Sequence, residues 1–543
     1  MVTPAGDKGH LNYGRALRIS AMKFRDHVAL EFRGARYTFG ELNRQVNAMA
    51  HALSAHGVRS GDRVLILSGN SPDYIRLLFA AAKLGAVCVP TSTALTESDL
   101  IFVLRASRPS LVVAGEAYLD LARQAVRGAA LSGEPAIVGL QVDSAVPVDG
   151  AVPQDAPPAT WPEWLDVGAH PVIEPVAELP PDDAPAILLF TSGSMGTPKA
   201  VVKSFANLTW HAINRQLAEP RRERERELFV LPLTGVGFGN FVVTDVIVGA
   251  TCVLEPSFDP SRTARLLAQG AISHAFLAPT MLMAVEATGD NLRFPGVSVI
   301  ETAYEITPAQ RARVAQMFPD ARILYSYGCT EGSMGRAPAE AFLADPTCVG
   351  FASGLDEYRV VGHADDHHGP DSLGPIEVAG PTVMRGYLTA SGELSQDVRD
   401  GWFDTGDLGW VDDAGALHFG GRQKDMIKSG GMNVYAWDVE SALAAYPEIE
   451  SVAVIGLPDD YWGEAVVAVL QPKDGARLEL AQVRRHAEAN LPGFRRPKAY
   501  FVTGRLPLNA TGKLAKGELR KQVLAGVIRR LDGEPASTGD RET

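Results

Sequence analysis

The sequence predicts an α/β protein of at least two domains, and three observations support this. The chain has 543 residues, more than one hydrophobic core usually serves. Predicted helices and strands alternate along its first part, as they do in proteins built on largely parallel sheets. A second, shorter alternation follows residue 424 and has the size of one small α+β domain.

The alternation near the N-terminus consists of two helices and two strands. The Tyr-Thr-Phe segment at residues 37–39 introduces a helical pattern that runs through Leu53, and residues 63–68 form a short apolar strand. Residues 74–84 are helical, and a second apolar strand follows at residues 85–89. Because each strand is separated from the next by a helix, we expect the strands to be parallel.

The pattern after residue 424 is more compact. We expect helices at residues 439–445 and 481–490, and strands at 451–456, 465–470 and 499–502. A Gly/Asp-rich, strand-like stretch precedes this region, so we place a domain boundary near Lys424. The residues after Asp532 are polar and contain Gly and Pro, and we expect a disordered tail at residues 533–543.

Composition and charge narrow the classes of function. Apolar residues make up 46% and aromatic residues 7% of the chain, which suits a soluble enzyme and argues against disorder. The formal charge of -13 argues against a general nucleic-acid binder, which needs a surplus of Lys and Arg on one face. The first residues contain no apolar signal segment, and no run of about 18 apolar residues occurs. We therefore expect a cytoplasmic protein that acts on small molecules, without a membrane partner.

Several stretches have structural rather than chemical interpretations. The four cysteines form no CxxC pair, which gives no support for a zinc site or a disulfide framework, and Cys88 and Cys252 are expected in the core. Residues 146–185 are rich in Pro, Ala and acidic residues, and we expect an acidic surface connection. The alternating Arg and Glu residues at 221–227 favour a solvated face over a docking patch.

The strongest chemical signal lies at residues 188–200, where an apolar strand leads into a turn of hydroxyl and glycine residues that ends in a lysine. Glycines allow backbone N–H groups to face an anion, hydroxyls donate further hydrogen bonds, and the lysine adds charge. The Walker A pattern is absent, and an ordinary surface turn explains the glycines but not the lysine. We predict phosphate binding by Thr191, Ser192, Gly193, Ser194, Gly196, Thr197 and Lys199.

A second cluster follows a predicted buried strand at residues 325–332. The strand ends in an aromatic residue, a hydroxyl and a carboxylate, at the kind of edge where α/β proteins bind ligands. Tyr327 has the chemistry to stack on a base, and Glu331 to hold a magnesium ion bound to phosphate oxygens. Taken alone, this segment is equally compatible with a core strand that ends in a polar loop.

Two further segments have less specific chemistry. Residues 401–409 and 421–431 contain Asp407, which is suited to ribose hydroxyls, and a Gly430-Gly431 pair that indicates a bent backbone. Residues 506–514 place Lys513 on a glycine-containing turn near the end of the chain. On its own, such a lysine is usually solvated.

In their order and spacing, these four segments together resemble the ANL superfamily of adenylating enzymes, which includes acyl- and aryl-CoA synthetases, peptide-synthetase adenylation domains and luciferases. The resemblance extends from residues 37–39, through 85–90, to Lys513. It implies a large N-terminal domain of several subdomains (residues 1–423) and a small mobile α+β C-terminal domain (residues 424–532). The active site would lie between them and use ATP, Mg²⁺ and CoA.

The resemblance also implies roles for single residues. Residues 191–199 correspond to the phosphate loop, Tyr327 to the adenine-stacking residue, and Thr330 and Glu331 to the phosphate and magnesium contacts. Asp407 and Arg422 match the ribose-binding pair, Lys424 the hinge position, and Lys513 the lysine of the adenylation step. Lys428 and Asn433 stand where some relatives place further nucleotide contacts.

The implied chemistry is the attack of a carboxylate on the α-phosphate of ATP. Lys513, magnesium and the phosphate-loop donors would neutralise the charge that gathers around phosphorus while pyrophosphate leaves. In the family, rotation about the hinge then moves Lys513 away and brings the Gly430-Gly431 loop in for the acceptor thiol.

The sequence departs from the family pattern around the expected substrate pocket. Thr234 and Gly235 replace an aromatic-His pair that thioester-forming relatives often carry, ahead of Asn240. Residues 301–308 replace a Gly-Gly-Ala-like strand end. Ala200 stands where glycine is usual, and Ala436 where proline is usual. The expected pocket residues are Thr234, Gly235, Asn240, Ala303, Tyr304 and Gly328. These changes leave the identity of the acid open.

We therefore expect an AMP-forming acid:CoA ligase. A close alternative hands the activated group to the phosphopantetheine of a separate carrier protein or to an amine, as in natural-product biosynthesis. A rarer alternative activates another oxyanion such as nitrite. A catalytically silent nucleotide-binding scaffold is disfavoured, because it would not need Lys199, Glu331, Asp407, Arg422 and Lys513 together.

Overall fold

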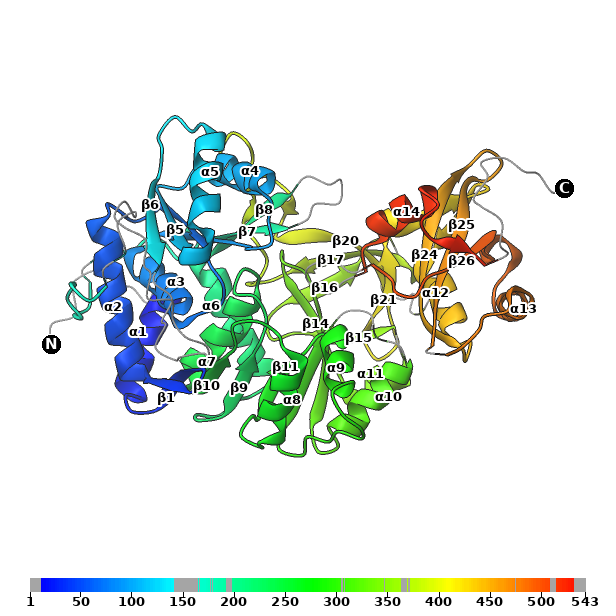
Figure 1. The fold of residues 1–543 in the computed structure, drawn as a ribbon, viewed down its shortest axis with the longest axis horizontal. Coiled ribbons are helices and arrows are strands. Elements are labelled where there is room, and N and C mark those ends of the chain that lie inside the picture. The colour runs from blue at the N-terminus through cyan, green and yellow to red at the C-terminus, as the bar shows by residue number, and fades with distance from the viewer. Residues whose placement is uncertain are drawn as a thin grey trace, which may run out of the picture.

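A computed structural model shows a chain organised around three β-sheets (Figure 1). The structure describes residues 11–140, 165, 167–175, 177, 179–191, 198–303, 306, 308–345, 347–362, 369, 372–473, 475–507 and 514–531. In Figure 1 the yellow-to-red C-terminal part stands beside the larger blue-to-green body, and the strands β20 and β21 lie where the two parts meet.

The first sheet has seven strands among the described residues, and its middle is parallel. Its order is β18 (Gly386–Tyr387), β8 (Lys199–Ser204), β7 (Pro185–Thr191), β4 (Val87–Thr91), β3 (Arg63–Leu67), β5 (Leu111–Gly115) and β6 (Ala136–Leu140). Strands β3, β4, β5 and β6 are paired in parallel, whereas β7 and β8 form an antiparallel hairpin. The hairpin matters for function, because the predicted phosphate loop connects its two strands.

Helices cover both faces of this sheet. One face packs on α4 (Glu97–Ser107) and α5 (Leu119–Ala129). The other packs on α1 (Tyr13–Lys23), α2 (Phe39–Ala55), α3 (Pro72–Leu84) and α6 (Phe205–Ala218). The helix starts follow from sequence: Thr38 and Glu41 form a capping box at α2, and Ser71 caps α3 ahead of Pro72. Gly85 ends α3 in the left-handed conformation that glycine adopts without strain.

The second sheet has fourteen strands among the described residues. Its path is β16 (Glu357–Val360), β17 (Gly374–Ala379), β20 (Trp402–Val411), β21 (Leu417–Arg422), β15 (Cys348–Ala352), β14 (Ser333–Pro338), β13 (Arg322–Gly328), β12 (Val299–Ala303), β11 (His274–Phe276), β9 (Arg226–Phe229), β10 (Thr251–Leu254), β1 (Val28–Phe32) and β2 (Ala35–Thr38). The short strand β19 (Val398–Arg399) pairs with β20. The run from β13 to β1 is parallel, and the remaining pairs are antiparallel.

Short helices accompany the parallel strands of this second sheet. They are the π-helix η2 (Phe238–Val242), α7 (Val243–Val248), α8 (Pro260–Ala268), α9 (Pro279–Glu286), α10 (Pro308–Met317) and α11 (Ala339–Ala344). The apolar residues of α8, α9 and α10 form one core with the inner strands, including Ile300, Ile323, Leu282 and Val314, whereas η2 and α7 pack into the core of the first sheet. Strands β12 and β13 therefore lie deep in the body, and their carboxyl ends reach the candidate site.

The third sheet is formed by the C-terminal part of the chain. It contains β23 (Met432–Tyr435), β22 (Met426–Ser429), β25 (Gly463–Pro472), β26 (Ala499–Val502), β27 (Arg529–Arg530) and β24 (Ile449–Asp459). Helices α12 (Ala436–Ala444) and α13 (Leu480–Asn490) pack on one face, and α14 (Lys516–Leu524) on the other. The predicted boundary at Lys424 falls in the 3-10 turn η4 (Gln423–Asp425) that joins β21 to this sheet.

The predicted α/β class is confirmed, and one local prediction is wrong. The charged run at residues 221–227 does not form a solvated face as a whole, because Arg221 and Glu227 are buried. The Arg221 guanidinium donates to Glu227 and, at 2.9 Å, to Asp245 on α7. Glu227 belongs to the same run, but Asp245 lies 24 residues away, so the local pattern could not reveal the buried cluster. Cys88 and Cys252 are buried as expected.

Most of the expected acidic connection at residues 146–185 lies outside the described residues, as does the expected tail at residues 533–543. None of the helices within the described residues combines the length and the apolar character needed to cross a bilayer.

Candidate active site

The β7–β8 hairpin brings Lys199 to Tyr387, which contacts Glu331. Thr191 and Lys199 face each other in the hairpin register, at the mouth of the predicted phosphate loop. The Lys199 ammonium lies 4.2 Å from the ring centroid of Tyr387, a cation–π contact. The Tyr387 hydroxyl donates a 2.8 Å hydrogen bond to the Glu331 carboxylate. A lysine, a phenol and a carboxylate therefore converge here, while Ser192, Gly193, Ser194, Gly196 and Thr197 lie outside the described residues.

A second cluster forms at the end of β13 around Asp407. The Tyr327 hydroxyl donates to Asp407 Oδ2 at 2.7 Å, and Arg422 Nε lies 3.3 Å from Asp407 Oδ1. Asp407 and Arg422 are direct partners in the β20–β21 register, so the backbone sets their spacing. Burial and the nearby Asp407 carboxylate raise the pKa of the Tyr327 phenol well above its ordinary value. The phenol is therefore a neutral donor at physiological pH, and its ring lies 5.8 Å from that of Phe419.

Tyr327 and Glu331 connect the two clusters, because they stand four residues apart at one strand end. Thr330 lies between them and is half-buried. The structure thus brings together five predicted site residues: Lys199, Tyr327, Glu331, Asp407 and Arg422.

The expected substrate-pocket residues that the structure describes come from the ends of β12 and β13, from η2 and from the turn before η2. Ala303 pairs in register with Ser326 at the end of β12, and Gly328 ends β13. Asn240 lies on η2, and its carbonyl accepts hydrogen bonds from Thr244 at 2.7 Å and Arg215 at 3.4 Å. Thr234 is half-buried and Gly235 exposed in the preceding turn, and Tyr304 lies outside the described residues.

Strands β12 and β13 also contribute to a buried ionic cluster. Glu301 pairs with Arg215 at 2.8 Å and Arg336 at 3.3 Å, and Ser326 donates a hydrogen bond to it. Burial alone would raise the pKa of Glu301, but Arg336 and Arg215 hold it well below its ordinary value. The ends of β12 and β13, next to the expected pocket residues Ala303 and Gly328, therefore carry a buried charged cluster.

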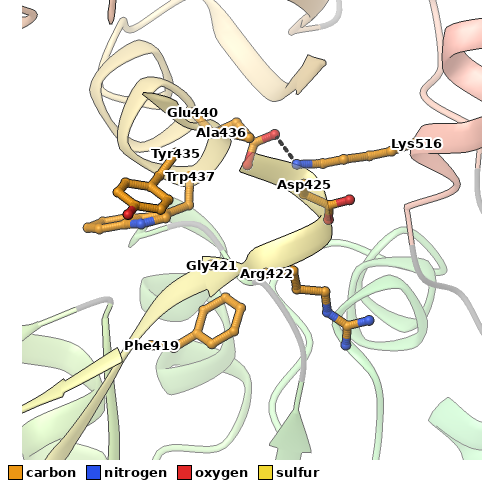
Figure 2. A pocket seen from close by; sticks show the side chains of 9 residues that line it. All are labelled: Phe419, Gly421, Arg422, Asp425, Tyr435, Ala436, Trp437, Glu440 and Lys516. Carbon is orange, nitrogen blue, oxygen red and sulfur yellow. Dashed lines mark ion pairs between the residues drawn. The ribbon is translucent and has the colours of Figure 1, made fainter. Parts of the chain in front are cut away.

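A small pocket lies where the body meets the C-terminal part, and Figure 2 shows its lining. Arg422 precedes the η4 turn and Asp425 is its last residue, and Trp437 and Glu440 come from α12. Lys516 at the start of α14 pairs with Glu440 at 2.8 Å (Figure 2). The other lining residues are Phe419, Gly421, Tyr435 and Ala436.

Contacts across this junction hold the C-terminal part in its present position. Trp437 lies 6.0 Å from Trp410 of β20 between ring centroids, and Arg313 of α10 pairs with Glu450 of β24 at 3.2 Å. Lys513 lies outside the described residues, but Lys516, three residues further on, reaches the pocket that contains Arg422.

The predicted residues of the β22–β23 hairpin are placed differently. Lys428 and Asn433 face each other in the hairpin register, are exposed, and do not line the junction pocket. Lys424 is exposed within η4, the single turn that links two sheets.

Two residues beside Glu331 were not predicted from the sequence. Tyr387 contacts its carboxylate, and buried Lys203 contacts its backbone carbonyl. The role of Tyr387 could not be predicted from the residues around it, because its partner Glu331 is 56 residues away. The sequence does contain a sign of Lys203, because this charged residue directly follows the apolar Ala200-Val201-Val202 segment of β8.

Comparison with known proteins places most of the chain in one family. Residues 17–388 match the family described as AMP-binding enzyme, and residues 438–513 match the AMP-binding enzyme C-terminal domain. The chain is 32% identical over 500 residues to a feruloyl-CoA synthase of an Amycolatopsis species, covering 91% of this chain and 96% of the relative. It is 31% identical over 513 residues to the indoleacetate–CoA ligase of Aromatoleum aromaticum, covering 91% and 95%.

Solved structures agree with this assignment. ATP-bound MatB from Rhodopseudomonas palustris superposes with a TM-score of 0.81 at 25% identity, covering 94% of this chain and 99% of that one. The o-succinylbenzoate CoA synthetase of Bacillus subtilis, in complex with its acyl-adenylate intermediate, superposes with a TM-score of 0.77 at 25% identity, covering 93% and 97%. The predicted resemblance and fold are thus confirmed, and the chain belongs to the AMP-binding enzymes of the ANL superfamily.

Proposed function

We propose that this protein is an acid:CoA ligase, which activates a carboxylic acid with ATP as its acyl-adenylate and then transfers the acyl group to CoA. The relatives named above are CoA ligases and synthetases, and they cover nearly all of this chain. The observation that carries the proposal is the convergence of Lys199, Glu331, Tyr327, Asp407 and Arg422 at one strand end.

The donor set fits ATP. Asp407 supplies carboxylate oxygens suited to ribose hydroxyls, beside an aromatic ring suited to a base. Lys199 supplies a cation at the mouth of the hydroxyl- and glycine-rich turn. These two groups of side chains lie at opposite ends of the segment 327–331, as a nucleoside and its phosphates would require.

Magnesium fits Glu331 as a shared ligand. Within the described residues, no group of three or more His, Cys, Asp and Glu side chains is placed to hold a metal. A magnesium ion here would therefore take its remaining ligands from phosphate oxygens and water, as it commonly does. When bound, it would neutralise phosphate charge, while Tyr387 orients the Glu331 carboxylate.

We propose that Lys513 supplies the cation for adenylate formation. Lys516 lies in the junction pocket beside Arg422, and Lys513 precedes it by three residues. A movement of the C-terminal part would therefore change the distance between Lys513 and the candidate site. The 3-10 turn around Lys424 is the hinge we propose for that movement.

The test is ATP–pyrophosphate exchange across a panel of acids, followed by thioester formation with CoA. The panel includes aryl-substituted acids, because the relatives are named for feruloyl and indoleacetate substrates. Exchange together with an acyl-CoA product would support the proposal. Exchange without a thioester, but with transfer to an amine or a carrier phosphopantetheine, would move the function to the alternative acceptor. Absence of exchange and of Mg·ATP binding would indicate a silent scaffold.

A further inference from the structure

Lys203 is a buried lysine directly behind Glu331. It lies on β8, four residues after Lys199, and its side chain is fully buried. Its ammonium donates to the Glu331 carbonyl at 2.8 Å and to the Thr382 carbonyl at 2.6 Å, and lies 3.3 Å from His211 Nε2 on α6. An ammonium has three N–H donors, so these three acceptors use all of them.

The two carbonyls belong to the segments that frame Glu331. The Glu331 carbonyl also accepts a 2.7 Å bond from the backbone N–H of Met384, which ties the two segments together. Thr382 is held from its other side, where its hydroxyl donates to Asp356 at 2.9 Å. Asn207, at the start of α6, donates to the carbonyls of Pro381 and Val383. Lys203 thus joins β8, α6 and the segment 381–384 to the residue that carries the candidate magnesium ligand.

This arrangement is costly unless it is fully hydrogen-bonded, because a buried ammonium loses its hydration. Here the acceptors are neutral carbonyls and a neutral imidazole rather than a carboxylate in direct contact. The side chain therefore fixes backbone atoms and does not form a simple ion pair. Because the Glu331 carboxylate is held by Tyr387, its position depends on both anchors: Lys203 at the backbone and Tyr387 at the side chain.

We propose that Lys203 is a positioning residue for the first half-reaction: its ammonium fixes the backbone of Glu331 so that the carboxylate meets Mg·ATP. The inference rests on the proposed function. Lys203 does not touch the nucleotide in this role, and the second half-reaction, in which magnesium and pyrophosphate have left, does not depend on it.

The test uses Lys203→Met, which keeps the length of the side chain and removes its three donors. A matched control exists in the same chain. Lys83 on α3 is also buried and donates to Asn43, Asn47 and Glu174, and none of these residues belongs to the candidate site. Lys83→Met therefore reproduces the loss of a buried, fully bonded ammonium without touching Glu331.

Three measurements are made on full-length protein at a temperature where both variants are folded: Mg·ATP binding by calorimetry without acid, the magnesium dependence of ATP–pyrophosphate exchange, and thioester formation from presynthesised acyl-adenylate. Lys203→Met should weaken Mg·ATP binding and raise the magnesium requirement about tenfold or more, the effect of losing bonds from a charged donor. Thioester formation from the adenylate should stay within about twofold of the wild type, as should all three measurements for Lys83→Met.

Equal behaviour of the two variants, or a parallel loss in both half-reactions of Lys203→Met, would overturn the positioning role. If Lys203→Met does not fold, Lys203→Gln replaces it. Its amide keeps two N–H donors, but it is uncharged and one atom shorter, so it should weaken Mg·ATP binding in the same direction and by less; binding equal to that of Lys83→Met would overturn the role. A wild type that binds Mg·ATP but exchanges with no acid would still test Lys203 through the binding measurement. A wild type that does not bind Mg·ATP would overturn the proposed function and, with it, this inference.

Discussion

Replacing Tyr327 with phenylalanine should weaken nucleotide binding through Asp407 and not through the ring. The ring that we propose for base stacking is kept, and only the hydroxyl that donates to Asp407 at 2.7 Å is lost. Asp407 is buried, so its carboxylate depends on protein donors and not on water. Hydrogen bonds to charged groups contribute about 1.5–3 kcal/mol, which corresponds to about 10- to 150-fold in affinity.

We expect the lower end of that range, because Arg422 remains beside the other carboxylate oxygen at 3.3 Å. A double-mutant cycle isolates the pair. In an Asp407→Ala background the hydroxyl has no carboxylate to orient, so Tyr327→Phe should change AMP affinity less than about twofold. The assay is AMP binding by calorimetry for the wild type, both single variants and the double variant.

The same cycle with Arg422→Met provides the control. The Arg422 side chain is 44% exposed, and solvent-exposed ion pairs contribute about 0–1 kcal/mol. Its coupling to Asp407 should therefore be smaller than that of Tyr327. Additive effects of Tyr327→Phe and Asp407→Ala, within about 0.5 kcal/mol, would refute the claim that the hydroxyl acts through the carboxylate.

Three further outcomes are expected. Lys513→Ala should slow adenylate formation by about 10²- to 10³-fold and leave the fold intact, and near-normal pyrophosphate release would defeat its assignment. Lys424→Pro, in the η4 turn, should spare pyrophosphate exchange and impair thioester formation, whereas equal loss in both would count against the hinge. Burial lowers the pKa of His274 to about 3, so the folded state binds fewer protons than the unfolded state between about pH 6.5 and 3. The free energy of unfolding should fall as the pH falls through this window, by up to about 1.4 kcal/mol per pH unit. Denaturation midpoints at pH 7.5 and 5 should therefore differ more in the wild type than in His274→Gln, and equal differences would show that His274 does not titrate this way.

The sequence predicts those helices and strands whose ends are set by capping residues and whose buried faces are set by apolar periodicity. The predicted helix at residues 74–84 corresponds to α3, whose start is set by Ser71 and Pro72 and whose end is set by Gly85. The predicted strand at residues 499–502 coincides with β26, and the expected strand at 63–68 with β3 apart from one residue. Apolar periodicity and capping residues act within a few positions, so a single sequence contains them.

The parts that were missed depend on partners far along the chain. Arg221 is buried because Asp245 and Glu227 meet it in the folded protein, and a run of alternating charges gives no sign of that. Lys203 is tied to Glu331 and Thr382, which lie 128 and 179 residues away. The convergence of Lys199, Tyr327, Glu331, Asp407 and Arg422 was expected from the resemblance, because the order and spacing of the motifs are visible in the sequence. The side chains that support those ligands had no such signature.

The position of the Asp407–Arg422 pair indicates how the proposed domain movement would be coupled to nucleotide binding. Asp407 is buried within β20, whereas Arg422 is the last residue of β21 and the residue from which the η4 turn starts. A rotation about that turn would leave Asp407 in place, because β20 is paired on both sides, with β17 and β21. It would change the surroundings of Arg422, which also lines the junction pocket with Trp437, Glu440 and Lys516. In the proposed ribose contact, Asp407 is fixed, whereas the surroundings of Arg422 depend on the position of the C-terminal part. Nucleotide binding and domain orientation should therefore influence each other through Arg422.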